Sequence, residues 1–398
     1  MKAFLVALVC ASAMAQQPMD FAGAHDQFTP VVMQATVRPV PFAGSDGMTH
    51  LDYELQLINA QKDAVGVEAI EVLDADSGKV LLKLAGDDVK KWFTLLDKAP
   101  ATKIGAGQVG YAWLDVKFSG AAPRRLKHRL TVTAKEKALK NSAMAASREQ
   151  ETFPIEGGEV AVASQAALVL GPPLQGTGWV AMSACCTNDG HRRAMIPING
   201  TLYVAQRFAI DWIKLGDDGR LVRQGGKIDV NHDYPTYATN AIAVADATVV
   251  SVLDGLPERT AGTLPQDTTL QNVTGNHVIL DLGGSRYGFY AHLQPGTLRV
   301  KKGDRVKKGQ VLALVGNSGN TTGPHLHFHV MDGLTALGAQ GLPYVIDSFA
   351  VQGMVRDIPD DEGPSAFTEP LPVSPTPPRE RRMQYPLENT VVDFPGGR

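Results

Sequence analysis

The stretch TTGPHLHFHV, residues 321–330, places three histidines at alternate positions directly after a Gly-Pro turn. These are His325, His327 and His329, in a chain that has ten histidines in total. Alternate residues of a β-strand point to the same face, so the three imidazoles would share one surface while Leu326 and Phe328 point into a core. The pattern predicts a core strand with one face suited to binding a metal or moving protons.

Histidines are concentrated around this strand. His292 lies in GFYAHLQPG, where another predicted strand runs into a turn, and His277 begins the apolar strand HVILDL. His277 has no polar pattern around it, and we interpret it as structural. The clustering favours a hydrolytic zinc site, in which two or three protein ligands hold the ion and another imidazole handles protons. The alternative is a row of strand histidines hydrogen-bonded to the backbone.

A longer segment connects this strand to a known family. Residues 275–330, GNHVILDLGGSRYGFYAHLQPGTLRVKKGDRVKKGQVLALVGNSGNTTGPHLHFHV, resemble the catalytic domain of the lysostaphin-type zinc metallopeptidases, which cut peptide links in bacterial cell-wall peptidoglycan. The resemblance extends over roughly residues 179–345, and its most specific parts are YAHL and SGNTTGPHLHF. It implies an antiparallel β domain with a Zn²⁺ ion in a groove.

The resemblance also implies roles for single residues. His327, the second histidine of HLH, resembles the family's zinc ligand, and His325 resembles its catalytic histidine. His292 in YAHL matches a second active-site histidine that steadies the attacking water or the transition state. The remaining ligands come from a segment of form HxxxD, which is RFAID here, so Asp211 is retained as a metal ligand and Arg207 replaces a histidine.

Arg207 leaves the predicted zinc site one ligand short. A guanidinium remains protonated and has no lone pair, so it cannot coordinate zinc. Catalytic zinc sites normally use three protein ligands, and Asp211 and His327 supply two. Either another residue completes the set, or zinc binds weakly, or the site is empty and Arg207 pairs with Asp211 instead. The residues considered as a third ligand are His191, His232, Cys185 and Cys186.

The adjacent cysteines leave three interpretations open. Cys185 and Cys186 cannot link distant segments, because they are neighbours in the chain. They could form a vicinal disulfide in an oxidising compartment, bind a metal, or be packed as ordinary buried thiols.

The whole chain is predicted to be mainly β. Short alternating strands such as HLDYELQLIN predict an immunoglobulin-like β-sandwich over residues 28–140. We expect a linker over residues 141–178, a lysostaphin-type peptidase domain over 179–356, and a Pro-rich extended tail over 357–398.

The N-terminus predicts export. Residues 1–15 combine Lys2, an apolar run and Ala-Met-Ala, which is typical of a cleaved signal peptide. No later segment is apolar enough to span a membrane, so we expect a periplasmic or extracellular protein. The formal net charge of −3 gives no indication of a nucleic-acid partner.

These observations predict an exported zinc metalloendopeptidase acting on peptidoglycan peptides. The alternative is a catalytically inactive family member that binds peptidoglycan or regulates a partner cell-wall hydrolase. Arg207 favours the alternative, whereas the joint retention of Asp211, His292, His325 and His327 favours the enzyme.

Overall fold

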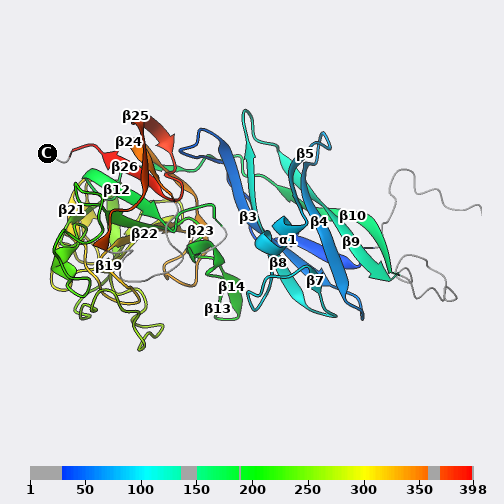
Figure 1. Ribbon diagram of the computed structural model, residues 1–398, viewed down its shortest axis with the longest axis horizontal. Helices are drawn as coiled ribbons and strands as arrows, with labels where there is room; N and C mark the ends of the chain where they lie inside the picture. Colours follow the sequence, from blue (N-terminus) through cyan, green and yellow to red (C-terminus); the bar gives the residue numbers. More distant parts are fainter. Residues whose placement is uncertain (1–28, 136–149, 188–189, 357–367, 397–398) are drawn as a thin grey trace, which may run out of the picture.

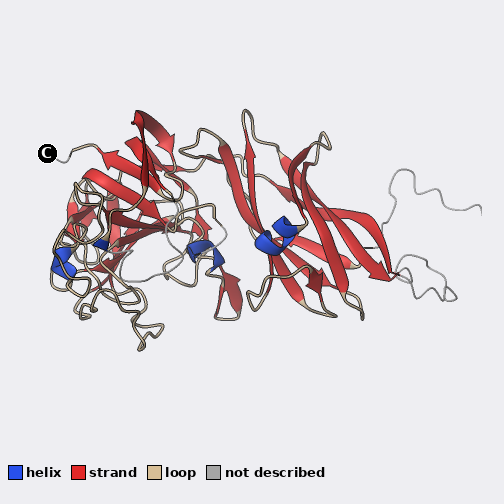
Figure 2. Ribbon diagram, viewed as in Figure 1, coloured by secondary structure: helices blue, strands red, loops and turns tan. Residues whose placement is uncertain are grey.

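The computed structural model describes residues 29–135, 150–187, 190–356 and 368–396. These residues are mainly β, as predicted, with loops between the strands (Figure 2). Their helical segments are short: α1 (Asp87–Trp92) and the 3₁₀ turns η2 (Gly190–Arg193) and η3 (Asn231–Asp233). The predicted signal peptide lies outside the described residues.

The N-terminal part consists of two five-stranded antiparallel sheets (Figure 1). The first has the order β1-β3-β8-β6, with β2 also paired to β3. Its strands are β1 (Val31–Ala35), β2 (Phe42–Ala43), β3 (Thr49–Asn59), β6 (Phe93–Leu95) and β8 (Val109–Phe118). The second has the order β10-β9-β4-β5, with β7 also paired to β4. Its strands are β4 (Val65–Asp74), β5 (Val80–Ala85), β7 (Lys103–Ile104), β9 (Arg125–Lys135) and β10 (Gln150–Ala161).

One hydrophobic core joins these two sheets. In β3, alternate residues with fully buried side chains enter it, namely Leu51, Tyr53, Leu55 and Leu57. They meet apolar residues of β4 and β9 from the second sheet, including Ile70 and Leu130. Alternation along a strand puts one set of residues on one face, so the intervening Asp52 and Glu54 must face the other way. Those two carboxylates are nevertheless buried.

The C-terminal part is built on a twelve-stranded sheet of order β11-β24-β26-β12-β15-β22-β19-β18-β17-β20, with β23 paired to β22 and β25 to β24. Its strands are β11 (Leu168–Leu170), β12 (Gly176–Met182), β15 (Ile210–Lys214), β17 (Ala247–Leu253), β18 (Asn276–Asp281), β19 (Tyr287–Leu293), β20 (Arg305–Val306), β22 (Leu326–Met331), β23 (Gly341–Leu342), β24 (Tyr344–Val355), β25 (Val373–Gln384) and β26 (Thr390–Phe394). All pairs are antiparallel except β11 with β24.

Two small hairpins complete the described structure. They pair β13 (Ile196–Ile198) with β14 (Thr201–Tyr203), and β16 (Asn240–Ile242) with β21 (Val311–Leu314). The β13–β14 hairpin lies between the two parts of the molecule (Figure 1). None of the described helices has the length and apolar character required to cross a membrane.

The structure differs from the expected linker and tail. The described part of 141–178 contains β10, which extends the second N-terminal sheet beside β9, and β11 and the start of β12, which belong to the large sheet. The described part of 357–398 contains β25 and β26, and β26 lies between β24 and β12 within that sheet. The Pro-rich segment, predicted as an extended tail, is thus extended but forms part of the sheet.

Candidate metal centre

Three neighbouring strands bring the predicted site residues together. In the antiparallel pair of β15 and β22, Asp211 lies directly opposite His327. On the other side of β22, Ala291 of β19 lies opposite His327, and His292 is the next residue along β19. Directly opposed residues of an antiparallel pair project to the same face of the sheet. The register alone therefore places Asp211 beside His327, with Nδ1 of the imidazole 2.8 Å from Oδ1 of the carboxylate.

His191 reaches the same point from a loop. It lies in η2, just beyond β12, whose last residue Met182 pairs with Asp211. The His191 ring donates from Nδ1 to the carbonyl of Ser183 at 2.9 Å, and its Nε2 lies 3.2 Å from Oδ2 of Asp211. A ring nitrogen held by a backbone carbonyl fixes the tautomer and leaves the other nitrogen free as a ligand.

His191, Asp211 and His327 form a group that fits a zinc ion. One ligand atom from each residue lies within 4.8 Å of those of the other two. Two imidazoles and one carboxylate are ligands that zinc accepts, and three protein ligands are what a catalytic zinc site requires. The other ring nitrogen of His327, Nε2, is 2.9 Å from Nδ1 of His329. Nδ1 of His327, which contacts Asp211, is therefore the nitrogen directed at the group. His329 thus contacts His327 and is not itself in the group.

His325 and His292 lie next to this group. Nδ1 of His325 contacts the Gly323 carbonyl at 2.9 Å, and its Nε2 lies 3.3 Å from Oδ1 of Asp211. Nδ1 of His292 contacts the Ser318 carbonyl at 2.7 Å. The two rings are 4.6 Å apart between centroids. Each imidazole is thus anchored through Nδ1 on a backbone carbonyl, which leaves Nε2 available for proton transfer or hydrogen bonding.

The charges of the group are strongly coupled. Burial would raise the pKa of Asp211, but the neighbouring His191 and His325 hold it well below its usual range. Burial opposes protonation of both histidines, yet the Asp211 carboxylate raises the pKa of His191 and of His325. In contrast, burial lowers the pKa of His327 to about 4 and that of His292 well below its usual value. One anionic carboxylate therefore sits among imidazoles in a site that attracts positive charge.

Residues 233–338 match peptidase family M23. This segment is therefore similar to the peptidases of that family. His292, His325 and His327 lie within the matched residues, whereas His191 and Asp211 precede them. Two of the three grouped residues thus lie upstream of the matched segment.

Curated relatives share this region. The chain is 34% identical over 94 residues to the peptidoglycan DD-endopeptidase ShyA of Vibrio cholerae, covering 23% of this chain and 21% of that protein. It is 44% identical over 57 residues to the peptidoglycan DD-endopeptidase ShyB of the same organism, covering 14% of this chain and 13% of that protein. The chain therefore spans about a fifth or less of the length of these relatives.

A solved structure with a similar region is the catalytic domain of the antimicrobial peptidase lysostaphin from Staphylococcus simulans. It is 21% identical, with coverage of 42% of this chain and 84% of that chain and a TM-score of 0.22.

The structure contradicts the predicted alternative role of Arg207. Its guanidinium does not pair with Asp211 but forms a buried ion pair with Glu54 of β3. Arg207 cannot face the metal group because β15 begins only at Ile210, and the preceding turn directs residue 207 toward the N-terminal part. The second imidazole beside Asp211 and His327 is that of His191.

The other residues considered as third ligands are not in this group. His232 lies in η3, and its ring contacts that of Tyr237. Cys185 and Cys186 form the vicinal disulfide that was one of three interpretations, so neither sulfur is a free thiolate. His277 is also separate, with Nδ1 near Thr274 and Gly275.

The group opens into a pocket of roughly 290 Å³. Besides the histidines and Asp211, its walls include Leu264, Val273, Phe289 and Leu337. The loop residues Asn320 to Thr322 form one border of the pocket. The carbonyls of Ser183 and Ser318, which orient two imidazoles, were not anticipated, because backbone hydrogen bonds between distant segments leave no trace in the sequence.

Proposed function

We propose that this chain is an exported zinc metalloendopeptidase that hydrolyses peptide bonds of bacterial cell-wall peptidoglycan. The observation that carries the proposal is the convergence of His191, Asp211 and His327 on one point beside His292 and His325. The M23 match and the peptidoglycan endopeptidases among the relatives support the reaction and substrate class. Export rests on the N-terminal sequence.

His191, Asp211 and His327 would hold the ion. Bound zinc supplies Lewis acidity that polarises a carbonyl and lowers the pKa of water. His325 would accept the proton of the attacking water at Nε2 and pass it to the leaving amine. His292 would hydrogen-bond the water or the developing oxyanion through Nε2, since its Nδ1 is engaged with Ser318.

The regulatory alternative has lost its main support. The alternative was favoured because Arg207 stands where a ligand histidine is expected. That argument holds only if no other residue fills the ligand position. His191 lies beside Asp211 and His327 and would fill that position, and Arg207 is engaged with Glu54.

Metal analysis and peptidoglycan hydrolysis together test the proposal. The mature protein should contain one zinc per chain, and a chelator should abolish release of peptide termini from purified peptidoglycan until zinc is restored. The His327→Ala variant should lose both zinc and activity. A wild-type protein that binds no zinc and leaves peptidoglycan intact would contradict the proposal.

A further inference from the structure

The face of β3 that points away from the N-terminal core carries two buried carboxylates. Asp52 and Glu54 are 2% and 0% exposed and do not belong to the apolar cluster of the N-terminal core. Two arginines of the C-terminal part contact them. Nη2 of Arg192 lies 2.8 Å from Oδ2 of Asp52, and Arg207 donates from Nε and Nη2 to the two oxygens of Glu54 at 2.8 and 2.7 Å.

Each arginine lies in a segment that carries a member of the metal group. Arg192 directly follows His191 in η2, and Arg207 precedes Asp211 by four residues. Arg207 also donates from Nη1 to the carbonyl of Gly341 at 3.0 Å, and Gly341 lies in β23 beside β22, the strand of His327. The buried guanidinium of Arg207 therefore connects β3 with the segment that carries Asp211 and with β23, which pairs with the strand of His327.

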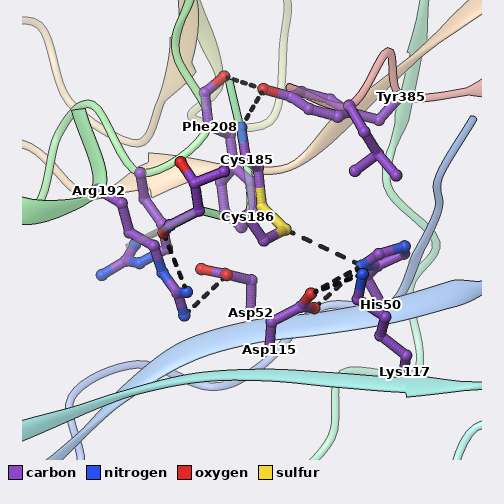
Figure 3. Close-up of a disulfide and its surroundings, with 12 residues drawn as sticks. His50, Asp52, Asp115, Lys117, Cys185, Cys186, Arg192, Phe208 and Tyr385 are labelled. Carbon is purple, nitrogen blue, oxygen red and sulfur yellow. Dashed lines mark hydrogen bonds and ion pairs between the residues drawn. A yellow bond between two sulfur atoms is a disulfide. The ribbon is translucent and has the colours of Figure 1, made fainter. Parts of the chain in front are cut away.

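Apolar and aromatic contacts fix the same segments against the first sheet. Met195 and Val204 pack with Tyr111 and Trp113 of β8 in one hydrophobic cluster. The guanidinium of Arg193 lies 4.8 Å from the centroid of the Trp113 ring. Residues 190–207 are thus packed over a broad surface of the N-terminal sheet. Figure 3 shows Asp52 and Arg192 close to the Cys185–Cys186 disulfide at this contact.

We propose that the N-terminal sheet is part of the metal centre, and that Asp52 and Glu54 are positioning residues that hold His191 and Asp211 in place for zinc. This inference rests on the proposed function. Its physical basis is that a buried charge left without its partner is strongly unfavourable. If Glu54 loses its carboxylate, Arg207 must move toward water, and the segment of Asp211 attached to it moves as well. Loss of Asp52 removes the side chain that Arg192, the neighbour of His191, contacts.

The two carboxylates differ in their protonation. Burial raises the pKa of Asp52 to about 8, with Arg192 opposing the shift. Burial acts in the same direction on Glu54, but Arg207 outweighs it and holds the pKa of Glu54 below its usual value. Glu54 is therefore the firmly ionised member, and its substitution gives the cleaner test.

The test compares zinc affinities of full-length variants by competition with a chromophoric chelator. Glu54→Gln keeps the size of the side chain but removes its negative charge and replaces one of the two oxygens that accept from Arg207 with an NH₂ group. Asp52→Leu provides a second, independent substitution should Glu54→Gln fail to fold. The matched control is Tyr53→Phe, because Tyr53 lies between them on β3 but points into the other core, where its hydroxyl is 2.8 Å from Nε2 of His128.

We expect Glu54→Gln and Asp52→Leu to weaken zinc binding by roughly tenfold or more, the range found when groups that orient metal ligands are removed. Tyr53→Phe should lower the melting temperature while leaving zinc affinity unchanged. Folded Glu54→Gln and Asp52→Leu variants with wild-type zinc affinity would overturn the inference but leave the proposed function standing. A wild type that binds no zinc would overturn both.

Discussion

At the scale of single residues, His191 is the part of the site that the sequence named only as one possibility among four. It is a loop histidine some distance from the HLH strand, and it reaches Asp211 because β12 and β15 are paired. Asp211, His292, His325 and His327 were predictable because their motifs specify them. The approach of His191 to this group was not, because it depends on how a loop returns over a sheet.

Removing His191 should therefore have the effect of removing a ligand. The His191→Ala variant should bind zinc at least about 100-fold more weakly than the wild type, since two protein ligands fall short of a normal catalytic site. Zinc content after dialysis, measured by atomic absorption, checks this. His232→Ala is the matched control, because His232 is a loop histidine of the same part of the chain outside the group. Equal zinc content in both variants would remove His191 from the site.

His325 should behave differently from the ligands. Its Nε2 lies near Asp211, but its assigned role is proton transfer, which contributes about 10²–10⁴-fold to a rate. The His325→Ala variant should keep its zinc while kcat for peptidoglycan peptides falls by that factor. Loss of zinc together with activity would instead make His325 a ligand.

At the scale of elements, β25 and β26 show where sequence patterns were misleading. Prolines 375, 377 and 378 lie in β25, which pairs with β24 along one side. A strand that pairs on one side tolerates residues without an N–H, so Pro-rich sequence and strand structure are compatible there. The alternating strands of the N-terminal part were predictable, because one buried face imposes a period of two.

The C-terminal strand should be essential for folding. β26 lies between β24 and β12, and its residues Val391, Val392 and Phe394 are buried. Burial of such side chains is worth about 1.5–3 kcal/mol each, so losing three approaches the whole stability of a typical domain. A chain ending at Asn389 should be insoluble or lack a cooperative thermal transition. A chain ending at Phe394 is the control and should melt like the full-length protein.

At the scale of the whole molecule, the two parts share buried charges and depend on each other. Glu54 and Arg207 are 0% and 1% exposed and come from different parts of the chain. The N-terminal sheets are therefore in contact with the segments that carry His191 and Asp211. Such contacts could not be predicted, because charged residues on the outer face of a strand ordinarily indicate that this face is exposed to solvent.

Buried histidines should make the stability of the molecule depend on pH. His128 accepts a hydrogen bond from the Tyr53 hydroxyl at Nε2 and donates from Nδ1 to the Gly158 carbonyl, so both nitrogens are satisfied in the neutral form. Burial accordingly lowers the pKa of His128 to about 4. Between that value and its unfolded pKa of about 6.5, the unfolded chain binds a proton that the folded chain does not, so stability falls as pH decreases through this window.

The difference between the folded and unfolded pKa of His128 corresponds to about 3 kcal/mol in the free energy of unfolding. This contribution to stability is fully present above a pH of about 6.5 and is lost by about pH 4. Other groups act in the opposite direction: Asp115 and Asp46 overcome the effect of burial and raise the pKa of His50. The His128 contribution is therefore isolated by comparison with His128→Gln, which does not titrate. Urea unfolding of both proteins at pH 7 and pH 5 should show a steeper loss of stability for the wild type. Parallel losses would mean that His128 is protonated in the folded state, and that its hydrogen bonds to Tyr53 and Gly158 do not hold it neutral.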